Sequence, residues 1–136
     1  MSRRRGREIA LQTLFQLDVV PTNDQESTMD MAISEQPQGE VTDDDLDFAR
    51  SMVNGTRSNI AAIDKLLAEN SKGWKVSRMA NVDRNIARMA VYELKFAEEA
   101  IDTSIVINEA VLLAKAYGTD DSSRFINGLL GSISRK

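Results

Sequence analysis

Hydrophobic side chains recur at three- and four-residue intervals along most of this chain, and that spacing limits the fold more than any other feature. In the first segment, Ile9, Leu14 and Leu17, together with Ala10, fall on one face of a helix of about four turns. The same spacing returns in segments 42–70, 81–97, 103–118 and 119–136. No convincing stretch of alternating apolar and polar residues competes with it. The sequence therefore predicts an all-α protein.

Proline and glycine mark the breaks between the predicted helices. Pro21 ends the first helix. A short helix is predicted from Ser27 toward Glu35, and the PQG stretch at 37–39 then breaks the chain again. Residues with capping chemistry stand at the remaining boundaries: Thr42, Asn81, and Thr103 or Ser104 as helix starts, and Gly118 as a helix end.

The predicted helix over residues 42–70 divides the chain into an N-terminal and a C-terminal group of helices, and Gly55 is expected to bend it. Short connections favour antiparallel neighbours in a helical bundle. A length of 136 residues suits one domain with its own core. We therefore expect a single helical domain over residues 1–136, with a seam along its long helix.

Two missing residue types exclude most catalytic chemistry. The chain has no cysteine and no histidine, so Ser–His or Cys–His nucleophiles and zinc–thiolate sites cannot be assembled. Glu93 and Glu109 are the acids set deepest in the predicted helices, and we expect them to tie helices together. The run Asp43–Asp45 points in several directions on a helix, which disfavours a magnesium site. We expect no enzyme, no cofactor and no metal.

Neither a membrane span nor a secretory signal is predicted. The apolar runs are far shorter than the roughly 20 residues that a bilayer requires. Glu8 and Gln12 interrupt the start of the chain before a signal-peptide core could form. We expect a cytoplasmic protein that does not use the membrane.

Charge is distributed in blocks. Residues 1–7 carry four arginines, residues 8–49 carry eleven acids and no base, and residues 50–136 hold thirteen bases and ten acids. Such asymmetry indicates two surfaces with different partners. The acids between Asp24 and Glu40, and those at 43–47, are interpreted as a solvated face.

The basic block opens the first predicted helix, where positive charge is least favourable; its members are Arg3, Arg4, Arg5 and Arg7. The helix dipole and the repulsion among the cations oppose this arrangement, and Gly6 weakens the first turn further. Glu8 can relieve part of the repulsion, for instance by pairing with Arg4. An RNA phosphate backbone would turn the same charges into a binding site. The alternative is a frayed, solvated terminus, or a membrane-surface or targeting tail.

Aromatic side chains matter because unpaired bases can stack on them. Tyr117 and Phe125 flank a turn that also carries Arg124, although Phe125 is more simply a core residue. Phe15 lies at the edge of the first apolar stripe, where an aromatic residue often anchors a protein partner. Trp74, the only tryptophan, is expected to close the seam between the two groups of helices.

The order and spacing of three stretches are typical of a known family: RRRGREIALQTLFQ, VDRNIARMAVYEL and VINEAVLLAKAYGTDDSSRFINGLL. Together they resemble the NusB family of bacterial transcription antitermination factors. The resemblance extends from Arg3 to Ser134 and is weakest over residues 20–41. It implies an all-α, NusB-like fold of two small helical bundles packed as a single domain, with a variable acidic segment at 20–47.

The resemblance implies binding and assembly without turnover. The partners would be the boxA element of a single-stranded nascent RNA and the small-subunit ribosomal protein NusE. With RNA polymerase and other Nus factors, they would let rRNA operons be transcribed through terminators.

Carried over position by position, the resemblance implies two sets of binding residues. The RNA contacts would be Arg3, Arg4, Arg5, Arg7, Asp121, Ser122 and Phe125. The ribosomal protein would bind around Phe15 and Asp83, where the carboxylate meets a basic partner; alternatively, Asp83 only interacts favourably with its helix dipole. The family more often has Ala where this chain has Gly6, and Tyr where it has Phe15.

A second hypothesis, from a different class, is a helical self-association module with no RNA selectivity. The N-terminal arginines would then pair with the acidic 24–47 block of a second copy, forming a homodimer. Both hypotheses can hold, because a homodimer could cover the arginines until RNA or the protein partner competes for them. Replacing the four arginines by alanine distinguishes the two hypotheses. The first hypothesis predicts weaker RNA binding, and the second predicts that oligomers dissociate.

Overall fold

The computed structural model describes residues 3–37, 39, 41–99 and 101–135. Seven α-helices and one short 3-10 helix make up the regular structure of these residues, and they contain no strand. The predicted all-α class is confirmed. Gln38 and Glu40 of the acidic segment, and residues 1, 2, 100 and 136 of the predicted domain, lie outside the described residues. In the described part of the chain, no helix combines the length and the apolar character needed to cross a bilayer.

The chain forms two compact units, Met1–Asn54 and Gly55–Lys136. The boundary between them falls within helix α3 (Asp43–Ser58). It therefore coincides with the helix that the sequence predicts to carry the seam.

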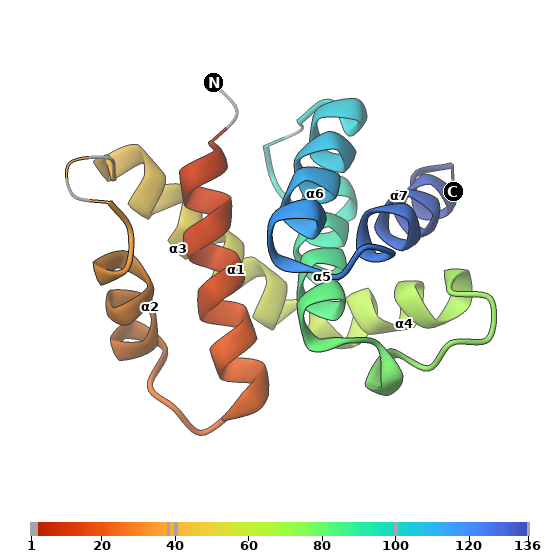
Figure 1. Ribbon diagram of the computed structural model, residues 1–136, viewed down its shortest axis with the longest axis horizontal. Helices are drawn as coiled ribbons and strands as arrows, with labels where there is room; N and C mark the ends of the chain where they lie inside the picture. The colour runs from red at the N-terminus through yellow and green to blue at the C-terminus, as the bar shows by residue number, and fades with distance from the viewer. Residues whose placement is uncertain (1–2, 38, 40, 100, 136) are drawn as a thin grey trace. The chain divides into compact units, whose positions relative to one another are not determined.

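The first unit holds α1 (Arg4–Val19), α2 (Gln25–Ser34) and most of α3. Helices α1 and α2 run antiparallel, side by side (Figure 1). The predicted apolar stripe of α1 is confirmed, since Ile9, Ala10, Leu14 and Leu17 are all buried. Helix α2 starts two residues earlier than predicted because Asp24, rather than a later residue, caps it.

The cap of α2 is made by a carboxylate in solvent. The Asp24 carboxylate accepts hydrogen bonds from the Ser27 backbone N–H at 2.9 Å and from the Ser27 hydroxyl at 2.8 Å. These two bonds lower the pKa of Asp24 below its ordinary value, and the bond from the Ser27 backbone N–H has the larger effect. The ionised carboxylate is also the form that the positive end of the helix favours.

The predicted cap of α3 is confirmed as a reciprocal pair. The Thr42 hydroxyl accepts from the Asp45 backbone N–H at 3.1 Å, and the Thr42 N–H donates to Asp45 Oδ2 at 3.0 Å.

The long helix predicted over 42–70 is divided at Asn59, where α3 ends and α4 (Ile60–Asn70) begins. The Asn59 side chain donates to the Gly55 carbonyl at 2.8 Å and so competes with the helical backbone bonds.

Gly55 has a packing role that the sequence does not predict. It lies inside α3, against the ring of Tyr92 from α5 (Asn81–Lys95). A Cβ at this position would overlap the Tyr92 ring. A glycine is therefore required for the close approach of the two helices.

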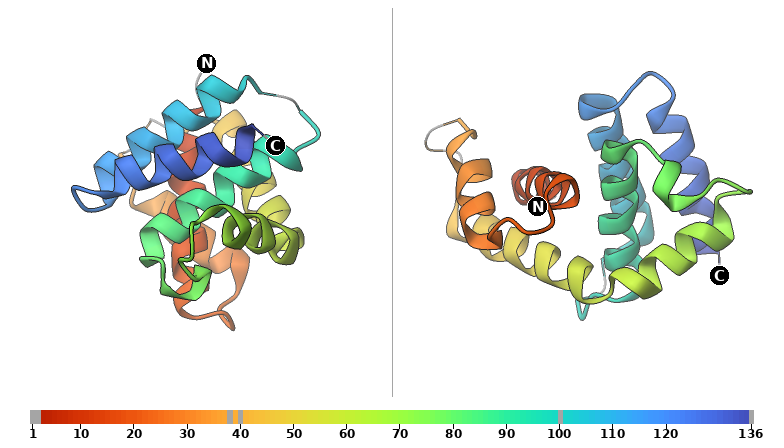
Figure 2. Two further views of the ribbon diagram at one scale, coloured as in Figure 1. Left: turned by 90° about the vertical axis from the view of Figure 1, so that its right-hand side faces the viewer. Right: turned by 90° about the horizontal axis from the view of Figure 1, so that it is seen from below.

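The second unit also contains the 3-10 helix η1 (Val76–Arg78), α6 (Thr103–Tyr117) and α7 (Ser122–Ser134). Helices α5 and α6 are antiparallel, and α6 folds back onto α7 through a short turn (Figures 1 and 2). The Arg88 guanidinium joins α5 to α4 by two bonds to the Asp64 carboxylate, at 2.8 and 2.9 Å. The predicted core of the last segment is confirmed for Ile126, Leu129, Leu130 and Ile133.

Helix boundaries in the second unit differ from the predicted caps by a residue or two. Ala80, and not Asn81, is the N-cap of α5, while the Asn81 side chain accepts from Arg84 within the helix. Asp102, and not Thr103 or Ser104, caps α6, because its carboxylate accepts from the Ser104 N–H at 3.0 Å. Gly118 ends α6 as predicted. Glu93 and Glu109 are buried, which agrees with their predicted places deep in the core helices.

Candidate nucleic-acid interface

The arginine-rich start of the chain is an ordered helical turn. Helix α1 begins at Arg4, and Arg3 precedes it with a left-handed backbone of φ 53°. The Arg7 backbone N–H donates to the Arg3 carbonyl at 3.1 Å, which closes the first turn. Arg4 is exposed and Arg3 and Arg5 are partly exposed, whereas Arg7 is only 2 % exposed.

An aromatic ring from α3 supports this turn. The guanidinium carbons of Arg3 and Arg7 lie 5.1 and 5.0 Å from the centroid of the Phe48 ring. A cation over an aromatic face gains about 0.5–2 kcal/mol, with the larger values where water is excluded. Arg7, which the resemblance places among the RNA contacts, is therefore a core residue of the first unit.

Gly6 makes room for the same ring. A Cβ at Gly6 would lie 2.8 Å from Cδ2 of Phe48 and 3.0 Å from the Asp45 carbonyl oxygen. Both distances are shorter than ordinary carbon contacts, so an alanine here would push α3 or the Phe48 ring away. The glycine, which looks like a weak point of the helix in the sequence, allows the close packing of α1 and α3.

Arg5 is held on the other side of α1. Its guanidinium pairs with the Glu8 carboxylate at 3.1 Å and donates to the side-chain oxygen of Gln36 at 2.7 Å. Gln36 in turn donates to the Gln12 side chain at 3.3 Å. Glu8 thus relieves part of the cationic repulsion, as expected, through Arg5.

The second predicted RNA-contacting group lies where the turn between α6 and α7 leads into the first turn of α7. Asp121 is exposed and Phe125 is half-buried, so Phe125 stands at the edge of the core and not within it. Ser122 is 1 % exposed, and its Oγ accepts from the Thr119 backbone N–H at 2.9 Å. The structure therefore places the three residues at the start of α7, where Ser122 is buried and holds the turn, Asp121 is exposed and Phe125 is half-buried.

The two predicted protein-contacting residues belong to different units. Phe15 is half-buried on α1, in agreement with its place at the edge of the apolar stripe. Asp83 lies in the first turn of α5, and its Oδ1 is buried with no hydrogen-bond partner. A buried carboxylate oxygen without a donor carries a desolvation cost that a nearby cation would offset.

The structure shows one candidate binding site that the sequence analysis does not identify. The loop after α4 forms a hollow of about 400 Å³ lined by Lys72, Gly73, Trp74, Lys75 and Arg78. Trp74 is 60 % exposed, so the expectation that it closes a seam is wrong. The available signal was charge, since no acid occurs between Glu69 and Asp83 in a chain of net charge −4. Among the described residues, no cluster of three or more acidic residues suited to a metal ion occurs.

The fold and these surfaces define a small helical protein that presents cations and aromatic rings to a partner, as nucleic-acid-binding modules do. A family model described as the NusB family matches residues 4–135. The chain belongs to the NusB family, which confirms the resemblance found in its motifs and the expectation of a regulatory protein rather than an enzyme.

Individual relatives agree with this assignment. The chain is 50 % identical to the transcription antitermination protein NusB of Pelotomaculum thermopropionicum, over 98 % of this chain and 89 % of the relative. It superimposes on T. maritima NusB with a TM-score of 0.84 and 32 % identity, covering 98 % of this chain and 91 % of the other. A solved complex of the antitermination factors NusB and NusE with double-stranded RNA contains a chain of the same fold, with a TM-score of 0.83 and 24 % identity, covering 98 % and 96 %.

Proposed function

We propose that this protein is a cytoplasmic transcription antitermination factor that binds boxA RNA together with the ribosomal protein NusE. RNA polymerase and other Nus factors are its indirect partners, and rRNA operons are its targets. The observation that carries the proposal is a match to the NusB family over nearly the whole chain, combined with an ordered turn of arginines at its start. The NusB–NusE complex with RNA shows which partners a member of this fold can assemble with.

The residues have distinct roles in this proposal. Arg3, Arg4 and Arg5 contact RNA phosphates, because part or all of each side chain is at the surface. Arg7 supports them from beneath, through the Phe48 ring that it shares with Arg3. Ordering the turn before the RNA arrives reduces the entropy cost of binding.

The turn between α6 and α7 supplies a contact of another kind. Phe125 offers a half-exposed ring for stacking on an unpaired base. The exposed carboxylate of Asp121 accepts from exocyclic amines of bases, which adds base selection to the charge of the arginines. Ser122 keeps both side chains in place through its bond to Thr119.

NusE binds on Phe15 and Asp83 in this proposal. Ribosomal proteins are typically basic, and the unsatisfied carboxylate oxygen of Asp83 favours a cationic group nearby. Phe15 provides the partly exposed aromatic surface that protein interfaces favour.

The test compares boxA RNA with a scrambled RNA, with and without NusE, across a series of salt concentrations. We expect NusE to tighten the binding of boxA while barely changing that of the scrambled RNA. The variant Arg3→Ala, Arg4→Ala, Arg5→Ala should bind RNA more weakly and lower the slope of log K against log salt by about 2, from about 0.7 for each phosphate contact of a single strand.

A control variant removes the same charge elsewhere. Lys65, Lys95 and Lys115 are exposed residues of α4, α5 and α6, and replacing all three by Ala should leave the salt slope unchanged. If neither RNA binds selectively even with NusE present, the proposal is wrong and the self-association hypothesis takes its place.

A further inference from the structure

The loop at 72–78 has the composition of a nucleic-acid contact. It carries Lys72, Lys75 and Arg78 around Trp74, and no acid occurs in the sequence between Glu69 and Asp83. All three cations are exposed, and so is the indole, at 60 %. An indole exposed to this extent among cations is accessible to a ligand.

The loop is held in place from both ends. At its start, the buried Ser71 donates from its hydroxyl to the Trp74 carbonyl at 2.6 Å, and the Trp74 N–H donates to the Ser71 carbonyl at 3.2 Å. At its end, the Arg84 guanidinium donates to the Val76 carbonyl at 3.2 Å and to Asn81 Oδ1 at 3.2 Å. The indole is therefore presented by a fixed backbone.

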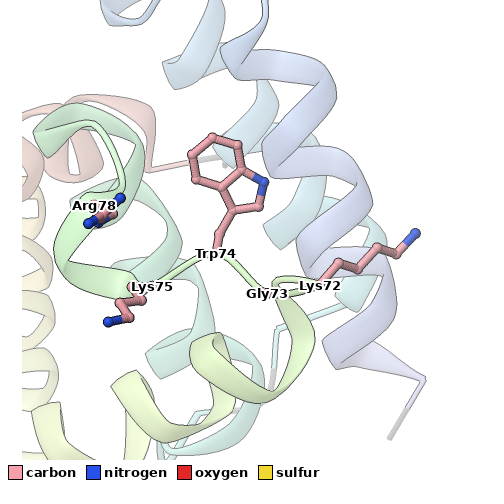
Figure 3. Close-up of a pocket in the computed structure, with 5 residues that line it drawn as sticks. All are labelled: Lys72, Gly73, Trp74, Lys75 and Arg78. Atoms are coloured by element: carbon pink, nitrogen blue, oxygen red, sulfur yellow. The ribbon is translucent and has the colours of Figure 1, made fainter.

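The side chains spread along the hollow. Figure 3 shows the Trp74 ring projecting from the loop, with Lys72 on one side of it and Lys75 and Arg78 on the other. Three cations that converge would suit one compact anion. Cations on both sides of a flat apolar ring match a polymer in which negative charges alternate with flat rings, and single-stranded RNA has this pattern.

We propose that the loop at 72–78 is a second RNA contact, separate from the arginine turn and from the α6–α7 turn. Trp74 stacks on an unpaired base, and Lys72, Lys75 and Arg78 neutralise the phosphates that flank it. The hollow of about 400 Å³ offers room for one nucleotide. Because stacking and phosphate contacts tolerate any sequence, this surface binds RNA without sequence selectivity. The inference rests on the proposed function only in taking RNA as the ligand.

Trp74 also provides the measurement, because it is the only tryptophan in the chain. A titration of the full chain with a 12-residue oligouridine should quench its fluorescence through stacking. Inorganic polyphosphate, which has charge but no bases, should bind without comparable quenching. Poly-glutamate tests for an acidic protein partner; quenching by poly-glutamate but not by oligouridine would overturn the proposal in favour of that partner.

Two variants separate the contributions of the ring and of the charges. Trp74→Leu keeps an apolar side chain but removes stacking, and should weaken oligouridine binding several-fold. Lys72→Ala, Lys75→Ala, Arg78→Ala should lower the salt slope by about 2, whereas Lys65→Ala, Lys95→Ala, Lys115→Ala should not. All these changes are at exposed positions, and a circular dichroism melt checks that folding is intact.

The outcome is independent of the test for boxA. If oligouridine neither quenches Trp74 nor binds more weakly to the loop variants, the second contact does not exist, while selective boxA binding with NusE still supports the proposed function. If oligouridine quenches the Trp74 fluorescence but the protein does not bind boxA in preference to the scrambled RNA, the proposed function fails. The loop then remains an RNA-binding surface.

Discussion

Arg7 and Arg4 carry the same charge three residues apart, but their surroundings give them opposite roles. Arg4 is exposed at the first position of α1, whereas Arg7 is buried with its guanidinium over Phe48. Removing a buried side chain costs packing and the ring contact together. An exposed arginine contributes mainly long-range charge.

This contrast predicts different losses for the two single variants. Arg7→Ala should lower the free energy of unfolding by about 1–3 kcal/mol. It should weaken RNA binding only indirectly, because the arginine turn loses the support of the Arg7 side chain. Arg4→Ala should leave stability within about 0.5 kcal/mol of the original and weaken RNA binding directly. Urea unfolding and RNA titration of both variants measure the two effects, and equal stability losses would contradict the assignment.

Helix α3 shows how packing between elements overrides helix propensity. Gly55 lies in its interior, where alanine is ordinarily favoured by about 1 kcal/mol. The Tyr92 ring occupies the space that a Cβ would need. The contact therefore fixes how closely α3 and α5 approach each other.

Gly55→Ala is thus expected to destabilise the protein, against its propensity, by about 1–3 kcal/mol. In a Tyr92→Leu background the same change should cost much less, because the ring that it displaces is gone. A double-mutant cycle by urea unfolding measures this coupling. Additive losses would show that the Tyr92 ring does not restrict Gly55.

At the scale of the whole molecule, the self-association hypothesis pairs the N-terminal arginines of one copy with the acidic 24–47 block of another. Members of both groups already have contacts within their own chain. Arg7 is buried against Phe48 and Arg5 pairs with Glu8. Among the acids, the Asp24 carboxylate caps α2, and Asp45 Oδ2 accepts from the Thr42 N–H at the start of α3. These contacts reduce what an electrostatic homodimer would gain.

We therefore expect the Arg3→Ala, Arg4→Ala, Arg5→Ala variant to have the same mass in solution as the original protein. Analytical ultracentrifugation at low salt, where charge pairing is strongest, is the appropriate measurement. A fall from dimer to monomer on substitution would instead support self-association through the arginines.

The sequence predicted the elements of this fold better than the contacts between them. Periodicity identified the helices, and Thr42 and Gly118 marked boundaries that the structure confirms. The sequence does not predict the division at Asn59, because the apolar spacing continues through it; the structure shows the Asn59 side chain bonded to the Gly55 carbonyl there. The burial of Arg7 could not be predicted either, since Phe48 lies on another helix and no local signal links the two.

The same limit applies to the candidate sites. Residues such as Arg4 and Asp121 could be selected from type and position because they lie at the surface. The sequence wrongly predicts a packed Trp74, since tryptophan is highly buried on average. The structure shows the loop backbone fixed by Ser71 and Arg84, with the indole exposed.

The stack of Arg3 and Arg7 on Phe48 has a thermodynamic consequence. Phe48 belongs to α3, the helix that begins in the first unit and ends in the second. A ligand that immobilises Arg3 also restrains Phe48, so its binding should slow hydrogen exchange along α3. Linkage is reciprocal, and any partner that steadies α3 should therefore raise the affinity of the arginine turn for RNA. In the proposed function, the stack therefore couples RNA binding at the arginine turn to any partner contact on α3.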